Sequence, residues 1–242
     1  MTSITNDQNI QEWSLVSDDV IDKFGDYGDF SRQHILNPTI FSLLGNVKNK
    51  HILDAGSGTG YLSRLLAKEG AIVTGIEPAK KLYDHAVSKE QEGLIIRYIQ
   101  EDLSTWKPKP NAFDVVVSNM VFMDIPDYQL AIKNCILSLK QNGIFVFSIL
   151  HPCFEEDVDW RKKQSVTTKE YFKEYAVKQY TGHFIHRPLS SYINFIIENG
   201  CVIEKLLEPK LPEATAKEYP QQERGTHVPL FLFIKARKSR ST

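Results

Sequence analysis

Short apolar runs alternate along this chain with stretches whose apolar residues recur every three or four positions. The first such pair is the run at 52–53 and the leucines of 62–66, which are followed by Gly70. The short run is typical of a buried strand, and the leucine spacing predicts a helix that stops at the glycine. A second buried strand is predicted at Ile72–Ile76. This order of strand, loop, helix and strand predicts an α/β domain.

The same alternation continues through the rest of the chain. Gly143 ends a helical pattern and precedes an apolar run, which indicates a helix, a turn and a strand within LKQNGIFVFSI. The continuous apolar run 230–234 suits a strand at the centre of a sheet. A doubly wound, mostly parallel sheet of seven strands is predicted in all. The remaining strands are predicted over 95–100, 113–118, 201–207 and 229–236, and the remaining helices over 81–88, 128–140 and 189–199.

Composition describes an ordinary globular protein. The 242 residues, 42% hydrophobic and 24% charged, can bury the core of a single domain. The formal net charge of −1 gives no basis for a nucleic-acid partner held through its phosphates, and the basic run 235–240 is short. The three cysteines are far apart, so neither a disulfide framework nor a metal site is predicted. No apolar run reaches the roughly 20 residues of a membrane helix and no signal-peptide core is present, so we expect no membrane partner and a cytoplasmic location.

The segment HILDAGSGTGY carries the most specific chemistry. Asp54 ends the first predicted strand, and Gly56, Gly58 and Gly60 follow at alternate positions before the helix. Glycines are required where a loop turns sharply or where a ligand approaches the main chain closely. A P-loop would need Lys and then Ser or Thr after its last glycine, and a dinucleotide loop would need its third glycine one position later. A carboxylate at the loop entrance is a poor neighbour for a pyrophosphate and suits a cationic ligand.

This loop resembles the first motif of the class I S-adenosylmethionine-dependent methyltransferases, which is an acid and any residue followed by Gly-x-Gly-x-Gly. Three further motifs of that family follow in order: Glu77 closes the second strand, Asp102 follows the third, and Phe-Asp-x-Val begins the fourth at 113–116. The resemblance implies that Glu77 accepts hydrogen bonds from the ribose hydroxyls and that Asp102 contacts the adenine. It also implies a Rossmann-like fold whose last strand lies antiparallel beside the fifth.

S-adenosylmethionine is therefore the expected cofactor, with S-adenosylhomocysteine as the product. A nicotinamide-dependent oxidoreductase is one alternative, which the glycine spacing disfavours. A non-catalytic protein of the same fold is another, and its cofactor loop would be expected to be degraded. The predicted cofactor contacts are Asp54, Gly56, Ser57, Gly58, Gly60, Glu77, Pro78, Asp102, Leu103, Ser118, Asn119, Tyr27 and Arg32.

One methyltransferase domain, 1–242, is predicted, with a cofactor-binding core at 46–150 and closing elements of the sheet at 189–242. Two further segments, 1–45 and 151–188, are surplus to the sheet and contain aromatic residues among charged ones. We expect the N-terminal helical cover, 1–45, to close over the cofactor and the insertion, 151–188, to cover the substrate. The predicted substrate contacts are Phe30, Met120, Phe154, Trp160, Tyr171 and Tyr175.

Methyl transfer needs an acceptor aligned with the sulfonium methyl group and, for some acceptors, a general base. His151 follows the fifth strand at the ligand-bearing edge of the sheet and is the first candidate for that base, with His183 and His186 next. An equally supported interpretation is that His151 only orients the loop ahead of Pro152.

The acceptor itself is predicted to be a small molecule. Residues 118–121 lack the Pro-Pro-aromatic pattern found in methyltransferases that act on adenine amino groups or glutamine amides. The phrases GDFSRQHILNP, MDIPD and FSILHPCF resemble small-molecule methyltransferases, including those of natural products. We therefore expect a secondary metabolite that is methylated on carbon, nitrogen or oxygen, with the choice of atom and the number of subunits left open.

Overall fold

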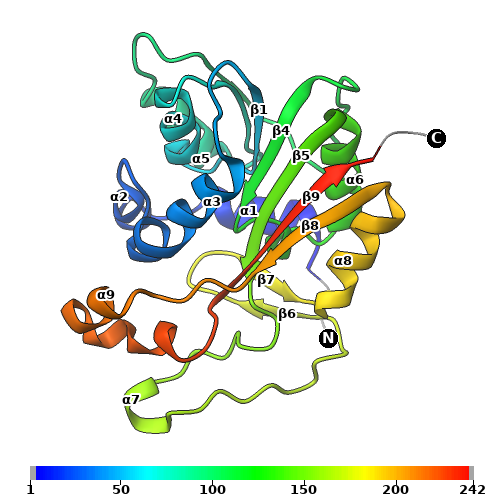
Figure 1. Ribbon diagram of the computed structural model, residues 1–242. Helices are drawn as coiled ribbons and strands as arrows, with labels where there is room; N and C mark the ends of the chain where they lie inside the picture. Colours follow the sequence, from blue (N-terminus) through cyan, green and yellow to red (C-terminus); the bar gives the residue numbers. More distant parts are fainter. Residues whose placement is uncertain (1–3, 240–242) are drawn as a thin grey trace.

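Seven strands form one sheet at the centre of the computed structural model, which describes residues 4–239 (Figure 1). Residues 1–3 and 240–242, the outer ends of the predicted cover and closing segments, lie outside the described range. The strand order is β3-β2-β1-β4-β5-β9-β8, with β1 to β5 parallel and β9 antiparallel to both of its neighbours. The predicted doubly wound sheet and its reversed last strand are confirmed. The strands are β1 (His51–Ala55), β2 (Ile72–Ile76), β3 (Ile96–Ile99), β4 (Phe113–Asn119), β5 (Leu139–Leu150), β8 (Cys201–Leu207) and β9 (Phe231–Lys238).

Helices cover both faces of this sheet (Figure 1). Side chains of adjacent strand residues point to opposite faces, so Val115 joins the apolar core under α3 and α4, whereas Val116 joins the core under α6 and α8. The central strands β1, β4 and β9 are thereby buried on both sides, which explains their largely apolar sequences, whereas the edge strands β3 and β8 are partly exposed and carry charged residues. These helices are α3 (Asn37–Leu44), α4 (Tyr61–Lys68), α5 (Lys80–Ser88), α6 (Tyr128–Ser138) and α8 (Leu189–Glu198).

The prediction that Gly143 ends the helix before β5 is wrong. Helix α6 stops at Ser138, and the chain turns directly into extended backbone at Leu139. Gly143 lies inside β5, beside the point where the pairing register with β4 shifts. A Cβ atom there would lie 2.8 Å from the carbonyl oxygen of Lys140. This glycine therefore permits close backbone packing at an irregular point of the strand, and it does not cap a helix.

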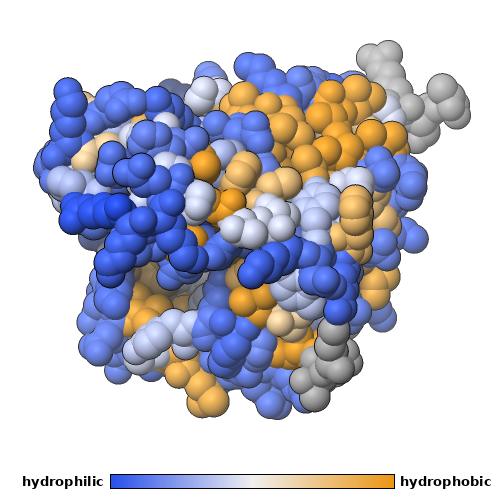
Figure 2. Space-filling view, turned by 90° about the horizontal axis from the view of Figure 1, so that it is seen from below, coloured by the Kyte–Doolittle hydropathy of each residue, from blue (hydrophilic) through white to orange (hydrophobic). Residues whose placement is uncertain are grey.

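The two surplus segments both lie at the carboxyl ends of the parallel strands, at the lower edge in Figure 1. Figure 2 shows this edge face on, with hydrophobic groups between hydrophilic ones. The chain between β8 and β9 adds two short helices that the sequence pattern did not predict, because their residues have no apolar periodicity. The elements at this edge are α1 (Asn6–Ser14), α2 (Asp18–Phe24), η1 (Arg32–Leu36), η2 (Phe122–Asp124), α7 (Trp160–Lys163), β6 (Tyr175–Lys178), β7 (His183–His186), α9 (Glu213–Glu218) and η3 (Pro220–Thr226).

Across residues 4–239, no helix combines the length and the apolar character that crossing a bilayer requires.

Candidate functional site

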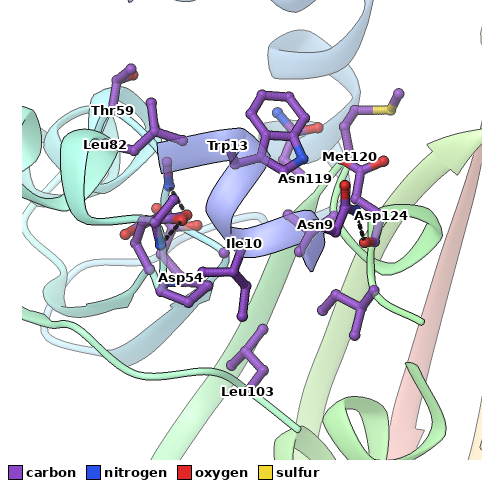
Figure 3. Close-up of a pocket in the computed structure, with 18 of the residues that line it drawn as sticks. Asn9, Ile10, Trp13, Asp54, Thr59, Leu82, Leu103, Asn119, Met120 and Asp124 are labelled. Atoms are coloured by element: carbon purple, nitrogen blue, oxygen red, sulfur yellow. Dashed lines mark hydrogen bonds between the residues drawn. The ribbon is translucent and has the colours of Figure 1, made fainter. Parts of the chain in front are cut away.

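A cavity lies at the carboxyl ends of the first four strands, beneath α1 (Figure 3). The strand order reverses between β1 and β4, and ligands of open α/β sheets bind in the crevice outside such a reversal. The cavity is thus where the topology alone would place a ligand. Its lining includes Asn6, Asn9, Ile10, Trp13, Phe24 and Arg32 from the N-terminal cover, and Asp54, Gly56, Ser57, Gly58, Thr59, Glu77, Pro78, Leu82, Asp102, Leu103, Asn119, Met120, Val121, Asp124, Ile125 and Pro126 from the core.

The glycine loop between β1 and α4 forms one wall of this cavity. All three glycines have positive φ, at 78°, 54° and 73°, a backbone conformation that strains other residues. A Cβ at Gly56 would meet the side chain of Val121 at 2.5 Å, whereas a Cβ at Gly58 would meet nothing within 4 Å. Gly56 thus allows close packing within the protein. Gly58 leaves its main chain open toward the cavity, as close approach of a ligand requires.

Glu77 is 7% exposed and lies directly after β2, where it ties two loops together. Its Oε2 accepts a hydrogen bond from the backbone N–H of Gly58 at 2.9 Å, and its Oε1 accepts one from Ala79 at 2.8 Å. Burial raises the pKa of Glu77 to about 7, against the lowering effect of these hydrogen bonds. Each carboxylate oxygen can accept a second hydrogen bond, so the group is able to bind two hydroxyls of a sugar.

Asp54 ends β1 and is 1% exposed. Its Oδ2 accepts a 2.6 Å hydrogen bond from the hydroxyl of Ser63 on α4, which fixes the carboxylate at the entrance of the glycine loop. Burial raises the pKa of Asp54 to about 6. A cationic ligand would stabilise the ionised form of this buried acid.

Asp102 lies in the turn after β3 and is held from two sides. Its carboxylate accepts hydrogen bonds from the backbone and hydroxyl of Ser104 at 2.8 and 2.7 Å, and from Nδ2 of Asn6 at 3.0 Å. Asn6 also accepts a hydrogen bond from the backbone N–H of Asp127 at 2.9 Å. The first turn of α1 is therefore docked on the third strand end.

Two hydroxyl groups of the loop, which line the cavity, suit a polar ligand that carries a nucleoside. The hydroxyl oxygens of Ser57 and Thr59 are buried and have no hydrogen-bond partner within residues 4–239. Buried hydroxyls of this kind are normally satisfied, so a ligand or water is expected to complete them. Apolar side chains that include Ile10, Leu82 and Leu103 face the same space and suit an aromatic base.

Most of the predicted cofactor residues line this one cavity. Gly60 and Ser118 do not: Gly60 is pressed against Tyr98, and the Ser118 hydroxyl bonds the carbonyl of Ala55. Tyr27 is 58% exposed and also lies outside the lining. The predicted residues that line it are Asp54, Gly56, Ser57, Gly58, Glu77, Pro78, Asp102, Leu103, Asn119, Arg32 and, from the predicted substrate set, Met120.

His151 is outside the cavity lining, so the prediction that it acts as the general base finds no support in this geometry. Its Nε2 lies 2.6 Å from Glu208 on the segment after β8, and its Nδ1 accepts a hydrogen bond from the backbone of Cys153 at 3.2 Å. Both ring nitrogens are thus engaged in holding the chain after β5. The alternative interpretation, a loop-orienting histidine, agrees with these contacts.

The remaining predicted substrate contacts pack within the covers and not against the cavity. Phe30 contacts the rings of His34 and Tyr219, and Phe154 lies against His151. The other insertion aromatics pair with histidines of their own surroundings: Trp160 stacks on His227, Tyr175 stacks on His186, and Tyr171 meets His186 edge-on. Aromatic composition alone did not distinguish a ligand-facing ring from one that packs its own segment.

Sequence reasoning missed the residues that α1 contributes to the cavity. A signal was present, because these residues recur every three or four positions and follow a capping box in which Thr5 and Gln8 bond each other reciprocally. Asp124 at the end of η2, and Ile125 and Pro126 directly after it, were also missed as lining residues. The residues contributed by α1 are Asn6, Asn9, Ile10 and Trp13.

Comparison with known proteins agrees with this geometry. A family model described as a methyltransferase domain matches residues 53–147. The ubiquinone biosynthesis O-methyltransferase of Coxiella burnetii is 34% identical over 156 residues, which cover 62% of this chain and 67% of that protein. An uncharacterized protein of Haemophilus influenzae is 30% identical over 223 residues, which cover 84% and 87% of the two chains. The solved S-adenosylmethionine-dependent methyltransferase of Mesorhizobium loti has the same fold, with a TM-score of 0.74 at 24% identity over 83% of this chain and 96% of that one.

The chain belongs to the class I S-adenosylmethionine-dependent methyltransferases. Its cofactor is S-adenosylmethionine. The predicted enzyme class is thereby confirmed over the oxidoreductase and the non-catalytic alternatives.

Proposed function

We propose that this enzyme transfers the methyl group of S-adenosylmethionine to a small molecule that enters the cavity beneath α1. The observation that carries the proposal is the shared lining: strand-end acids and apolar side chains of the N-terminal cover line the same cavity. A polar set at one side and apolar walls at the other is the arrangement expected for a cofactor and an organic acceptor.

Each part of the cofactor has a matching group. Glu77 is the proposed ribose ligand and Asp102 the proposed adenine contact, as the family motifs imply. Asp54 provides negative charge for the cationic methionine portion. Arg32, whose guanidinium lies 4.5 Å over the ring of Phe24 and 2.6 Å from Asp29, is the proposed partner of the cofactor's carboxylate.

Oxygen is the acceptor atom to be tested first. The matching relatives from Coxiella and Histophilus are named for O-methylation in ubiquinone biosynthesis. A phenolic quinone precursor therefore heads the proposed substrates, ahead of terpenoid, indole and other secondary metabolites.

Cofactor binding tests the site directly. Glu77→Ala should weaken S-adenosylmethionine binding about 10- to 100-fold, because a hydrogen bond to a charged group contributes about 1.5 to 3 kcal/mol. Gly58→Val should weaken it separately, because its positive φ and the added side chain both act at the ligand-facing wall. Gly45→Ala is a matched control, since Gly45 also has positive φ and lies outside the cavity lining. Unchanged affinity for both site variants, measured by calorimetry, would contradict the assignment.

Turnover is tested with methyl-labelled S-adenosylmethionine and a panel of catechols, phenols, indoles and amines. Label transferred to one chemical class identifies the acceptor atom. Transfer to a folded protein or a nucleic acid in preference to every small molecule would overturn the small-molecule proposal while leaving the cofactor assignment intact.

A further inference from the structure

Asp124 differs from the other acids of the cavity in having an unsatisfied carboxylate. Its Oδ1 is buried and has no hydrogen-bond partner within residues 4–239. The carboxylates of Asp54, Glu77 and Asp102 all accept hydrogen bonds from neighbouring protein groups. An unsatisfied buried carboxylate oxygen is costly, and it is expected where a ligand completes it.

The backbone of Asp124 is held firmly in spite of this. Its N–H donates to the carbonyl of Val121 at 2.8 Å within η2, directly after β4. Its carbonyl accepts a hydrogen bond from Nδ2 of Asn9 at 2.5 Å, which docks α1 against this turn. The position of the carboxylate is therefore set by a sheet strand and a helix, as catalytic groups require.

Its place in the cavity separates Asp124 from the cofactor acids. In Figure 3 it lies beside Met120 and Asn9, on the opposite side of the group from Asp54 and Thr59. The groups that bear on its charge come from three other elements. Burial raises the pKa of Asp124 well above its usual range and the charge of Glu77 adds to this, while Arg32 and Arg187 act in the opposite direction.

We propose that Asp124 is a catalytic residue that binds the acceptor's O–H or N–H group and takes up its proton during methyl transfer. This inference rests on the proposed function. The new bond forms between the methyl carbon and the acceptor atom while the carbon–sulfur bond breaks, and the electron pair of that bond stays on sulfur as a neutral thioether. The proton leaves the acceptor atom for a carboxylate oxygen of Asp124, so one positive and one negative charge disappear together.

The inference also restricts the acceptor. A hydroxyl or an amine can donate a hydrogen bond to Asp124, whereas a carboxylate acceptor would place a second anion beside it in a desolvated cavity. The ionised form of Asp124 therefore disfavours acceptors that are methylated on a carboxylate.

One test needs no acceptor. The pKa of Asp124 is measured by ¹³C NMR of carboxyl-labelled protein, with the resonance assigned by its loss in Asp124→Asn, in the S-adenosylmethionine and S-adenosylhomocysteine complexes. The sulfonium charge should lower this pKa by about one unit or more relative to the neutral thioether, because an opposite charge nearby favours the ionised form. Equal pKa values in the two complexes would place Asp124 away from the methyl group and overturn the inference. Failure of both ligands to bind would overturn the proposed function together with it.

The second test separates catalysis from cofactor binding. Asp124→Asn should lower the turnover of catechol or the preferred acceptor by about 100- to 10,000-fold and leave the dissociation constant of S-adenosylmethionine within about twofold. Asp127→Asn is the control, since it removes an exposed carboxylate three residues further along the same turn. If Asp124→Asn keeps its turnover, or loses cofactor affinity by as much as it loses turnover, Asp124 is not the base. If this variant fails to fold, Asp124→Ala provides the same comparison, because it also removes the carboxylate.

Discussion

The N-terminal cover and the insertion lie at the same edge of the sheet, yet they relate to the cavity in different ways. The cover contributes side chains of α1, α2 and η1 to the lining, whereas the insertion contributes none. The insertion aromatics pack on histidines of their own neighbourhood. Lying at the ligand-bearing edge is therefore not enough to reach the ligand. A segment must also present a face that the rest of the protein leaves unfilled.

Removing α1 should produce the largest difference between the two segments. Deletion of residues 1–15 removes Asn6, Asn9, Ile10 and Trp13 from the cavity wall, so S-adenosylmethionine affinity should fall about 100-fold. Calorimetry measures the affinity, and circular dichroism checks that the sheet remains. Cofactor binding as tight as that of the full chain would show that α1 is not a lid.

The acids under the cover should make cofactor binding depend on pH. Glu77 has a pKa of about 7 and Asp54 one of about 6, both raised by burial, so each is increasingly protonated as the pH falls below its value. Ribose hydroxyls and a cationic ligand prefer the ionised forms, so affinity should rise about tenfold or more between about pH 5.5 and about pH 8. Calorimetry in buffers of different ionisation enthalpy should detect proton release on binding. Glu77→Gln should flatten the profile, and an unchanged slope would contradict this assignment.

Substitution of a single side chain of the cover should lower cofactor affinity less than deletion of α1 does. Asn6→Ala removes the hydrogen bonds to Asp102, Ser104 and Asp127 without removing the helix. Cofactor affinity should fall about three- to tenfold, because α1 must then dock with fewer bonds. Gln11→Ala, on the exposed side of the same helix, should leave affinity unchanged. Equal losses in both variants would point to helix stability as the cause.

His151 and Trp160 of the insertion should show almost no effect on cofactor binding. His151→Ala removes the contact with Glu208 and should lower the free energy of unfolding by about 1 to 2 kcal/mol, with cofactor affinity and turnover both within about twofold. Trp160→Ala should change neither cofactor affinity nor turnover, since this ring stacks on His227 outside the cavity. A selective loss of turnover in His151→Ala, with the free energy of unfolding unchanged, would support a catalytic role for this histidine.

The fold and the strand-end residues that line the cavity could be predicted because they depend on local rules. Buried parallel strands must be continuously apolar, and the loop after β1 must contain glycine wherever φ is positive. The rest depends on which distant segments meet. The sequence around Trp160 does not indicate that its ring stacks on His227. The sequence around Gly143 does not indicate that the carbonyl oxygens of Lys140 and Asp114 leave no room for a side chain there. The cavity-lining face of α1 could have been predicted from the spacing of its residues, but its contact with Asp102 could not.

The hydrogen bonds of Asn9 have a kinetic consequence. This side chain bonds the carbonyl of Asp124 at 2.5 Å, and it exchanges two bonds of 2.9 and 2.8 Å with the backbone of His183 at the start of β7. These bonds hold α1 to η2 and to β7, so moving α1 away from the cavity requires them to break. Weakening the contact between Asn9 and this β6–β7 hairpin should therefore shorten the time that S-adenosylhomocysteine stays bound, although no residue of the hairpin lines the cavity.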